Sequence, residues 1–128
     1  MNDIERAKLR EEMYYCEVAR NAIEANGLTG LDGNKKELDN LLDNIVSPVV
    51  YPVKRNRIEA VSLTVYPVNE DTLRLESKIC LDMDSKIRTI NMIYKRGRNL
   101  SLMTNSDFTQ THNYREQIPA QARALKLR

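Results

Sequence analysis

The spacing of apolar residues changes at Pro48 from a helical period to a strand period. Near the start of the chain, apolar residues recur at steps of three and four, at Leu9, Met13, Cys16, Ala19 and Ile23. Such steps place side chains on one face of a helix. Asn2 and Glu5 have the spacing of a capping box, and Gly27 supplies an end signal. The pattern predicts a helix over residues 3–25.

A second helical stripe follows a glycine-rich connection. Asn34 and Glu37 repeat the capping spacing, and the apolar positions after them are Leu38, Leu41, Leu42 and Ile45. Pro48 cannot continue a helix because it lacks a backbone N–H. We therefore expect a helix over residues 35–46, and the two helices together would form an α-hairpin.

After Pro48 the apolar residues alternate with polar ones, which is the pattern of half-buried strands. The predicted strands are at about 49–53, 58–68, 72–83, 87–95 and 99–103, with Asp84-Ser85 as one of the turns between them. Pro52 cannot donate to a strand ladder, so the first strand is expected at an edge. The polar face of the third strand, with Arg74, Glu76 and Lys78, is expected to meet solvent or a polar interface.

Short connections imply antiparallel neighbours, and a sheet with one apolar face needs a cover. The predicted fold is α+β, with an N-terminal α-hairpin packed on one face of an antiparallel four- to five-stranded meander sheet. The helices should cover the face that carries Leu63, Leu75 and Leu81. Residues 1–104 would form a single domain, and residues 105–128 a polar C-terminal arm with a short helix near Pro119.

The composition favours burial through self-association. The chain has no Trp, one Phe and six Tyr in 128 residues, so its core must be aliphatic. Aromatic side chains supply the largest buried areas, and a core without them gains from an interface. We therefore expect a homo-oligomer. No window reaches the roughly 18 apolar residues that span a bilayer, and the chain start lacks signal-peptide features, so a cytoplasmic location without membrane contact is expected.

Charge is distributed unevenly along the chain. Residues 1–50 carry 6 Lys or Arg against 10 Asp or Glu, a balance of −4, and residues 51–128 carry 14 against 8, a balance of +6. The candidate polyanion-binding residues form two clusters at strand ends: Lys54, Arg55 and Arg57, and Lys95, Arg96 and Arg98. A meander would place the clusters at opposite ends of the sheet. Solvated turns are also rich in Lys and Arg, and acidic and basic parts can pair with each other.

No residue cluster indicates a reaction. His112 is the single histidine and lies in a polar stretch, so neither a multi-histidine metal site nor a catalytic histidine is expected. Cys16 and Cys80 are expected to be free thiols. The sequence predicts a protein that is not an enzyme and holds no cofactor or metal.

The leading hypothesis is a small protein-interaction module, such as an accessory, inhibitor or assembly factor, that binds a protein partner or itself. Two alternatives remain open. One is a nucleic-acid-binding regulator that uses the two basic clusters. The other is a small-ligand-binding protein with a pocket between the helices and the sheet.

Overall fold

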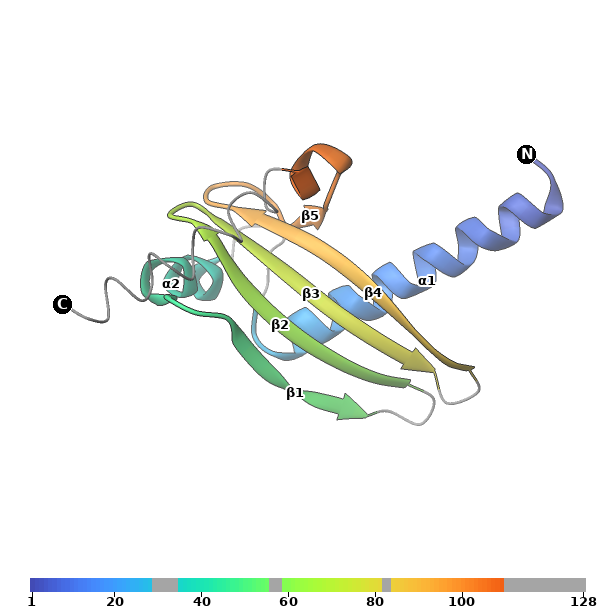
Figure 1. Cartoon of the computed structure of the whole chain (residues 1–128), viewed down its shortest axis with the longest axis horizontal. Helices are drawn as coiled ribbons and strands as arrows, with labels where there is room; N and C mark the ends of the chain where they lie inside the picture. The colour runs from blue at the N-terminus through green and yellow to red at the C-terminus, as the bar shows by residue number, and fades with distance from the viewer. Residues whose placement is uncertain (29–34, 56–58, 82–83, 110–128) are drawn as a thin grey trace.

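The computed structural model describes residues 1–28, 35–55, 59–81 and 84–109. Its elements follow in the order α1 (Asp3–Ala25), α2 (Lys36–Asn44), β1 (Val49–Arg55), β2 (Glu59–Asn69), β3 (Thr72–Leu81), β4 (Asp84–Lys95) and β5 (Ser101–Leu102). The strands form one antiparallel sheet in sequence order, and α1 crosses behind it in Figure 1. The predicted α+β class, with N-terminal helices against a meander sheet, is confirmed.

Both ends of α1 are specified by neighbouring residues. The side-chain Oδ1 of Asn2 accepts a hydrogen bond from the Glu5 N–H at 2.8 Å, which caps the first turn. Beyond the helix, Gly27 adopts a left-handed conformation with a φ of 80°. The Leu28 N–H then donates to the Ile23 carbonyl at 3.1 Å, as in a glycine C-cap. The helix therefore ends where the sequence supplies a residue that tolerates positive φ.

The start of α2 differs from the predicted capping pattern. Lys35 precedes its first turn and makes no side-chain capping hydrogen bond, while Asn34 lies outside the described residues. Glu37 and Asp39 place negative charge in the first turn, where the helix dipole favours it. The helix ends at Asn44, and the backbone of Ile45 is extended.

The strand registers place one apolar face against the helices. Val65 lies opposite Leu75, Leu75 lies opposite Met92, and all three side chains are fully buried. Leu63 and Leu75 cover the helix side as predicted. Leu81 is partly buried and packs against a second group of buried residues that includes Val61 and Ile79. Because side chains alternate along a strand, this register turns the polar positions to the opposite face.

Two strand boundaries differ from the predicted ones. Asp84, expected in a turn, begins β4 and pairs with Leu81 after a register shift beside Cys80. Pairing therefore resumes directly after residues 82–83. β5 is shorter than predicted, because it pairs with β4 only through Met92 and Ile93. Much of the outer edge of β4 has no strand partner among the described residues.

The core consists of two clusters along the same face of the sheet. The larger cluster joins both helices to the sheet and includes Ile23, Leu38, Leu42, Leu63, Val65, Leu75, Met92 and Tyr94. The smaller cluster joins α1 to β2 and β3 and consists of Tyr15, Val18, Ala19, Val61 and Ile79. α1 contributes to both clusters, so its second half is the main cover of the sheet.

After β5, residues 105–109 form a capped helical turn. Thr104 Oγ1 accepts a hydrogen bond from the Asp107 N–H at 3.1 Å, and Asp107 Oδ2 accepts one from the Thr104 N–H at 2.9 Å. The backbone hydrogen bond from Thr104, assisted by the charge of Lys95, lowers the pKa of Asp107. The short helix predicted near Pro119 lies outside the described residues.

Tyr94 links α2 to the sheet from a buried position on β4. Its hydroxyl donates to Asp39 Oδ1 at 2.6 Å. Burial, followed by the hydrogen bond to Asp39 and the charge of Asp39, raises the pKa of Tyr94 from 10.0 to about 12. A raised pKa means that the folded state holds this proton more tightly than the unfolded state does.

We predict that Tyr94→Phe lowers the free energy of unfolding at pH 7 by about 1–2 kcal/mol, because Asp39 loses its donor. The contribution of the Tyr94 proton is complete below pH 10.0 and is lost as the pH rises through about 12. Urea unfolding between these pH values should therefore show a steeper loss of stability in the wild type than in the variant. Parallel curves would contradict the role assigned to Tyr94.

Candidate functional site

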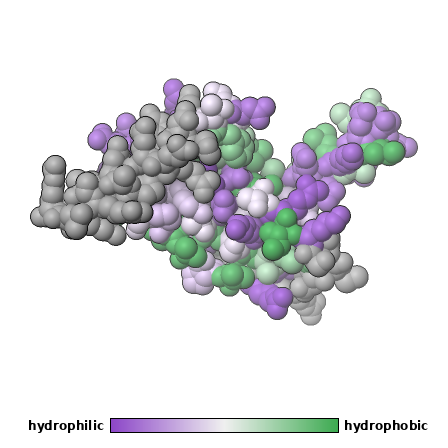
Figure 2. Space-filling view, viewed as in Figure 1, coloured by the Kyte–Doolittle hydropathy of each residue, from purple (hydrophilic) through white to green (hydrophobic). Residues whose placement is uncertain are grey.

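The first half of α1 extends past the sheet. Every residue from Met1 to Tyr14 is exposed, and the first buried residue of the helix is Tyr15. Large apolar side chains on this half are open to solvent, with exposed fractions of 68% for Ile4, 47% for Leu9 and 62% for Met13. Figure 1 shows the N-terminal turns of α1 projecting beyond the sheet, and Figure 2 shows hydrophobic and hydrophilic residues side by side on them. We call residues 3–14 the α1 arm.

The predicted burial of the α1 stripe is wrong for its first half. Leu9 and Met13 have the spacing of core residues but are exposed, because the apolar face of the sheet does not cover them. Ala19 and Ile23, the last members of the predicted stripe, are buried, and the sequence analysis missed the two residues that are buried with them, Tyr15 and Val18. Tyr15 lies three and four residues before Val18 and Ala19, so this spacing was also present in the sequence. The apolar residues of α1 therefore point in two directions, and one of them has no cover.

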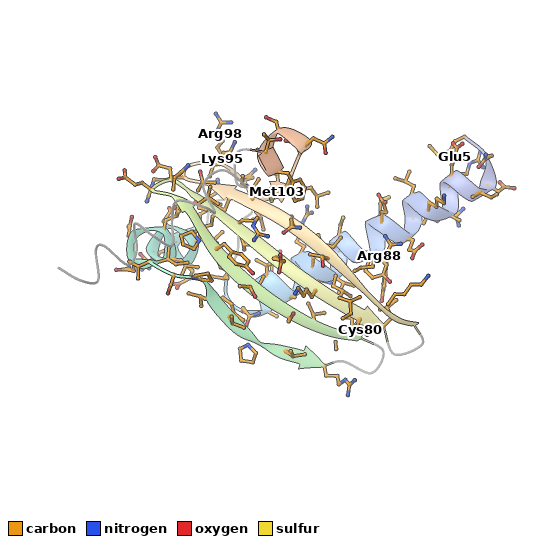
Figure 3. All side chains as sticks on the ribbon, in the orientation of Figure 1. Glu5, Cys80, Arg88, Lys95, Arg98 and Met103 are labelled. Carbon is orange, nitrogen blue, oxygen red and sulfur yellow. The ribbon has the colours of Figure 1, made fainter. Side chains whose placement is uncertain are left out.

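Contacts on both sides of α1 fix the direction of the α1 arm. On one side, Arg88 Nη2 of β4 lies 3.1 Å from Glu11 Oε1, and the Arg88 guanidinium lies 5.1 Å from the centre of the Tyr15 ring. On the other side, the Tyr14 hydroxyl donates to Glu59 Oε2 at 3.2 Å. Figure 3 shows Arg88 beside α1 and Glu5 far beyond it. The helix is thus held at the rim of the sheet by side-chain contacts of Glu11, Tyr14 and Tyr15.

An open groove follows α1 toward β5. The side chains that line it come from α1, except for Leu102 of β5, and include Leu9, Arg10, Glu12, Met13, Cys16, Glu17 and Arg20. Leu102 is itself an exposed apolar residue. The two arginines and two glutamates of the lining balance in charge. A groove that is lined by apolar side chains and carries no net charge is typical of a surface that binds a helix.

Cys16 lies in this groove and is half-buried. Burial raises the pKa of the Cys16 thiol, Glu12 raises it further, and Arg20 lowers it. A thiol needs a lowered pKa to act as a strong nucleophile near neutral pH. Cys16 is therefore suited to packing in the groove rather than to chemistry.

The structure places the predicted basic clusters at opposite ends of the sheet. Arg55 pairs with Ala60, which pairs with Cys80, so Arg55 of the first cluster lies at the end of the sheet where Figure 3 labels Cys80. Lys95 and Arg98 lie at the other end. Lys54 belongs to β1, and Arg57 lies outside the described residues. Of the candidate polyanion-binding residues that the structure describes, those of the first cluster and those of the second do not form one surface within a single chain.

Arg96 acts as a link within the fold. Its Nη2 lies 2.8 Å from Asp43 Oδ1 of α2, and its Nε lies 3.0 Å from Asp71 Oδ1 in the β2–β3 turn. Lys95 Nζ is 3.6 Å from Asp107 Oδ1, whereas Arg98 has no ion pair among the described residues. Part of the second basic cluster is therefore engaged with acidic residues of the same chain.

Within the described ranges, no group of three or more His, Cys, Asp or Glu side chains is placed to hold a metal ion. His112 lies outside those ranges. None of the described helices has both the length and the apolar character that a bilayer crossing requires. Comparisons with protein-family models, with curated proteins and with solved structures found no match.

We predict that Arg96→Ala lowers the melting temperature in 20 mM salt, because α2 and the β2–β3 turn lose their shared cation. The loss should shrink in 500 mM salt, since exposed ion pairs are screened. Arg98→Ala is the matched control and should leave the melting temperature unchanged at both salts. Equal effects of the two substitutions, measured by circular dichroism, would contradict the linking role.

Proposed function

We propose that the protein is a non-enzymatic interaction module that binds protein partners through the α1 arm, and that one of these partners is a second copy of the chain. The observation that supports the proposal is the α1 arm itself. Ile4, Leu9 and Met13 present apolar surface on a helix that leaves the domain. Exposed apolar side chains gathered on one element are typical of interaction sites.

The energetics of the arm favour a partner. Most helical stability in proteins comes from the packing of an apolar face, which the α1 arm lacks at Ile4, Leu9 and Met13. A helix that lies along the arm would give it packing, and burying a side chain such as Met13 contributes about 1.5–3 kcal/mol. The same contact would supply the extra burial that a core without Trp needs.

The charges of α1 match an antiparallel copy of α1. Arg10, Met13 and Glu17 follow one another at steps of three and four, so they share one side of the helix. Neither Arg10 nor Glu17 has an ion pair within the part of the chain that the structure describes. A two-fold axis beside Met13 would place Arg10 of one copy next to Glu17 of the other, and the reverse pair would form by symmetry.

The alternatives have less support. A continuous polyanion track would need both basic clusters, which lie at opposite ends of one chain. A pocket between helices and sheet is not favoured by the core, because Ile23, Leu63 and Leu75 fill that space with fully buried side chains. Nucleic-acid binding and small-ligand binding stay predictions.

We predict that the wild type forms dimers at micromolar concentration and that Met13→Glu converts them to monomers. The substitution places a charge where apolar contact is expected, once in each copy. Val50→Glu is the matched control, because Val50 is 71% exposed and lies on the opposite face of the sheet. Sedimentation velocity checks both variants, and a wild type that is monomeric throughout would overturn the self-association.

A charge swap tests the antiparallel arrangement in the same assay. Arg10→Glu should weaken the dimer about tenfold, because two attractive pairs become repulsive. Adding Glu17→Arg to the same chain restores both pairs with their signs exchanged, and dimerisation should recover. A double variant as weak as Arg10→Glu alone would exclude the proposed pairing while leaving other arrangements of the arm testable.

A further inference from the structure

Arg74 is buried on the face of the sheet that the helices do not cover. It lies on β3 between Tyr66 of β2 and Ile93 of β4, and its relative exposure is 3%. Ile93, on the same face, is 4% exposed. The sequence predicted that this polar face meets solvent or a polar interface, and Arg74 is far more enclosed than a solvent-facing arginine. Arginine is almost never fully buried unless its charge is paired.

One part of the guanidinium is held firmly. Nη1 donates to Asn91 Oδ1 at 2.7 Å and to Glu76 Oε2 at 3.0 Å. The guanidinium carbon lies 4.0 Å from the centre of the Tyr66 ring, so the flat group rests on an aromatic surface. These contacts come from all three central strands. They fix both the position and the plane of the guanidinium.

The other part of the guanidinium carries unused donors. Nε and Nη2 are both buried, and neither has a hydrogen-bond partner among the described residues. In an arginine side chain, the Nε–H and one Nη2–H lie on the same edge and point in the same direction. This edge matches the two oxygens of a carboxylate, which it binds through two parallel hydrogen bonds. Leaving both donors buried without acceptors is costly.

The local charge favours an anion with a single charge. Arg74 and Glu76 form a pair, and Lys78 Nζ lies 4.0 Å from the other Glu76 oxygen. Two cations and one carboxylate leave one positive charge in excess. A carboxylate would neutralise it, whereas the nearby Glu76 would repel the second charge of a phosphate.

We propose that the Nε/Nη2 edge of Arg74 is the centre of a carboxylate-binding site on this face of the sheet. The Tyr66 ring stacks on the guanidinium, and Asn91 and Glu76 accept hydrogen bonds from Nη1. The Nε–H and Nη2–H donors are therefore already oriented when the ligand binds. The site lies on the face opposite α1 and does not depend on the α1 arm. Its ligand is a small organic acid or the terminal carboxylate of a peptide.

The test follows the Arg74 Nε–H proton by NMR in the full-length protein. Burial shields this proton from solvent exchange, and the signal can be assigned through bonds in the wild type without any variant. Titration with sodium acetate should move it to lower field along a saturable curve, with half-saturation at roughly millimolar concentration. Sodium chloride at equal ionic strength is the control. An Nε–H signal that acetate leaves unmoved would overturn the proposal.

Variants and further probes define the site. Arg74→Lys keeps the charge but removes the paired Nε–H and Nη2–H donors, and should weaken acetate binding at least about tenfold. Arg98→Lys, at an exposed arginine, is the matched control and should bind as the wild type does. A hexapeptide with a free C-terminal carboxylate that outcompetes acetate, when its amidated form does not, would assign the site to peptide ends. Tighter binding of inorganic phosphate than of either carboxylate would overturn the proposed ligand class.

Discussion

A single apolar face runs across β2, β3 and β4, and both helices lie where they bury it. Val65, Leu75 and Met92 form a continuous row across these strands because the register keeps them on one side. Ile23 of α1 and Leu38 of α2 pack on this row. Its extent also limits the fold. α1 is longer than the surface that can receive it, so the α1 arm is a direct consequence of the size of the sheet.

Polar contacts fix the two ends of the helical layer. At one end, Glu11 meets Arg88, and at the other, Asp43 meets Arg96. In both pairs the acid comes from a helix of the N-terminal segment, and the base comes from β4 or the residue directly after it. Some acidic residues of positions 1–50 therefore form ion pairs with basic residues of positions 51–128. These pairs leave less unpaired basic surface than the sequence alone implies.

Periodicity predicted the elements of this fold well, because a step of two or of three to four residues reports directly which side chains share a face. It could not predict how far the opposing surface extends. Leu9 and Met13 therefore appeared to be core residues, although the sheet ends before it reaches them.

The sequence could not predict the separation of the two basic clusters or the enclosure of Arg74, for different physical reasons. Basic residues at strand ends are easy to find, but the distance between two turns depends on the completed meander. Arg74 alternates with apolar neighbours in the way that a solvent-facing residue does. Its enclosure depends on contacts with Tyr66 and Asn91, which lie on two other strands. No local pattern in the sequence records such contacts.

We propose that the α1 arm gains its stability from a partner helix. Amide hydrogen exchange of residues 3–14, followed at low and high concentrations of the full chain, tests it most directly. We expect protection of these amides to rise with concentration, while protection of the sheet stays constant. Protection of the arm that is equal at every concentration would contradict the claim.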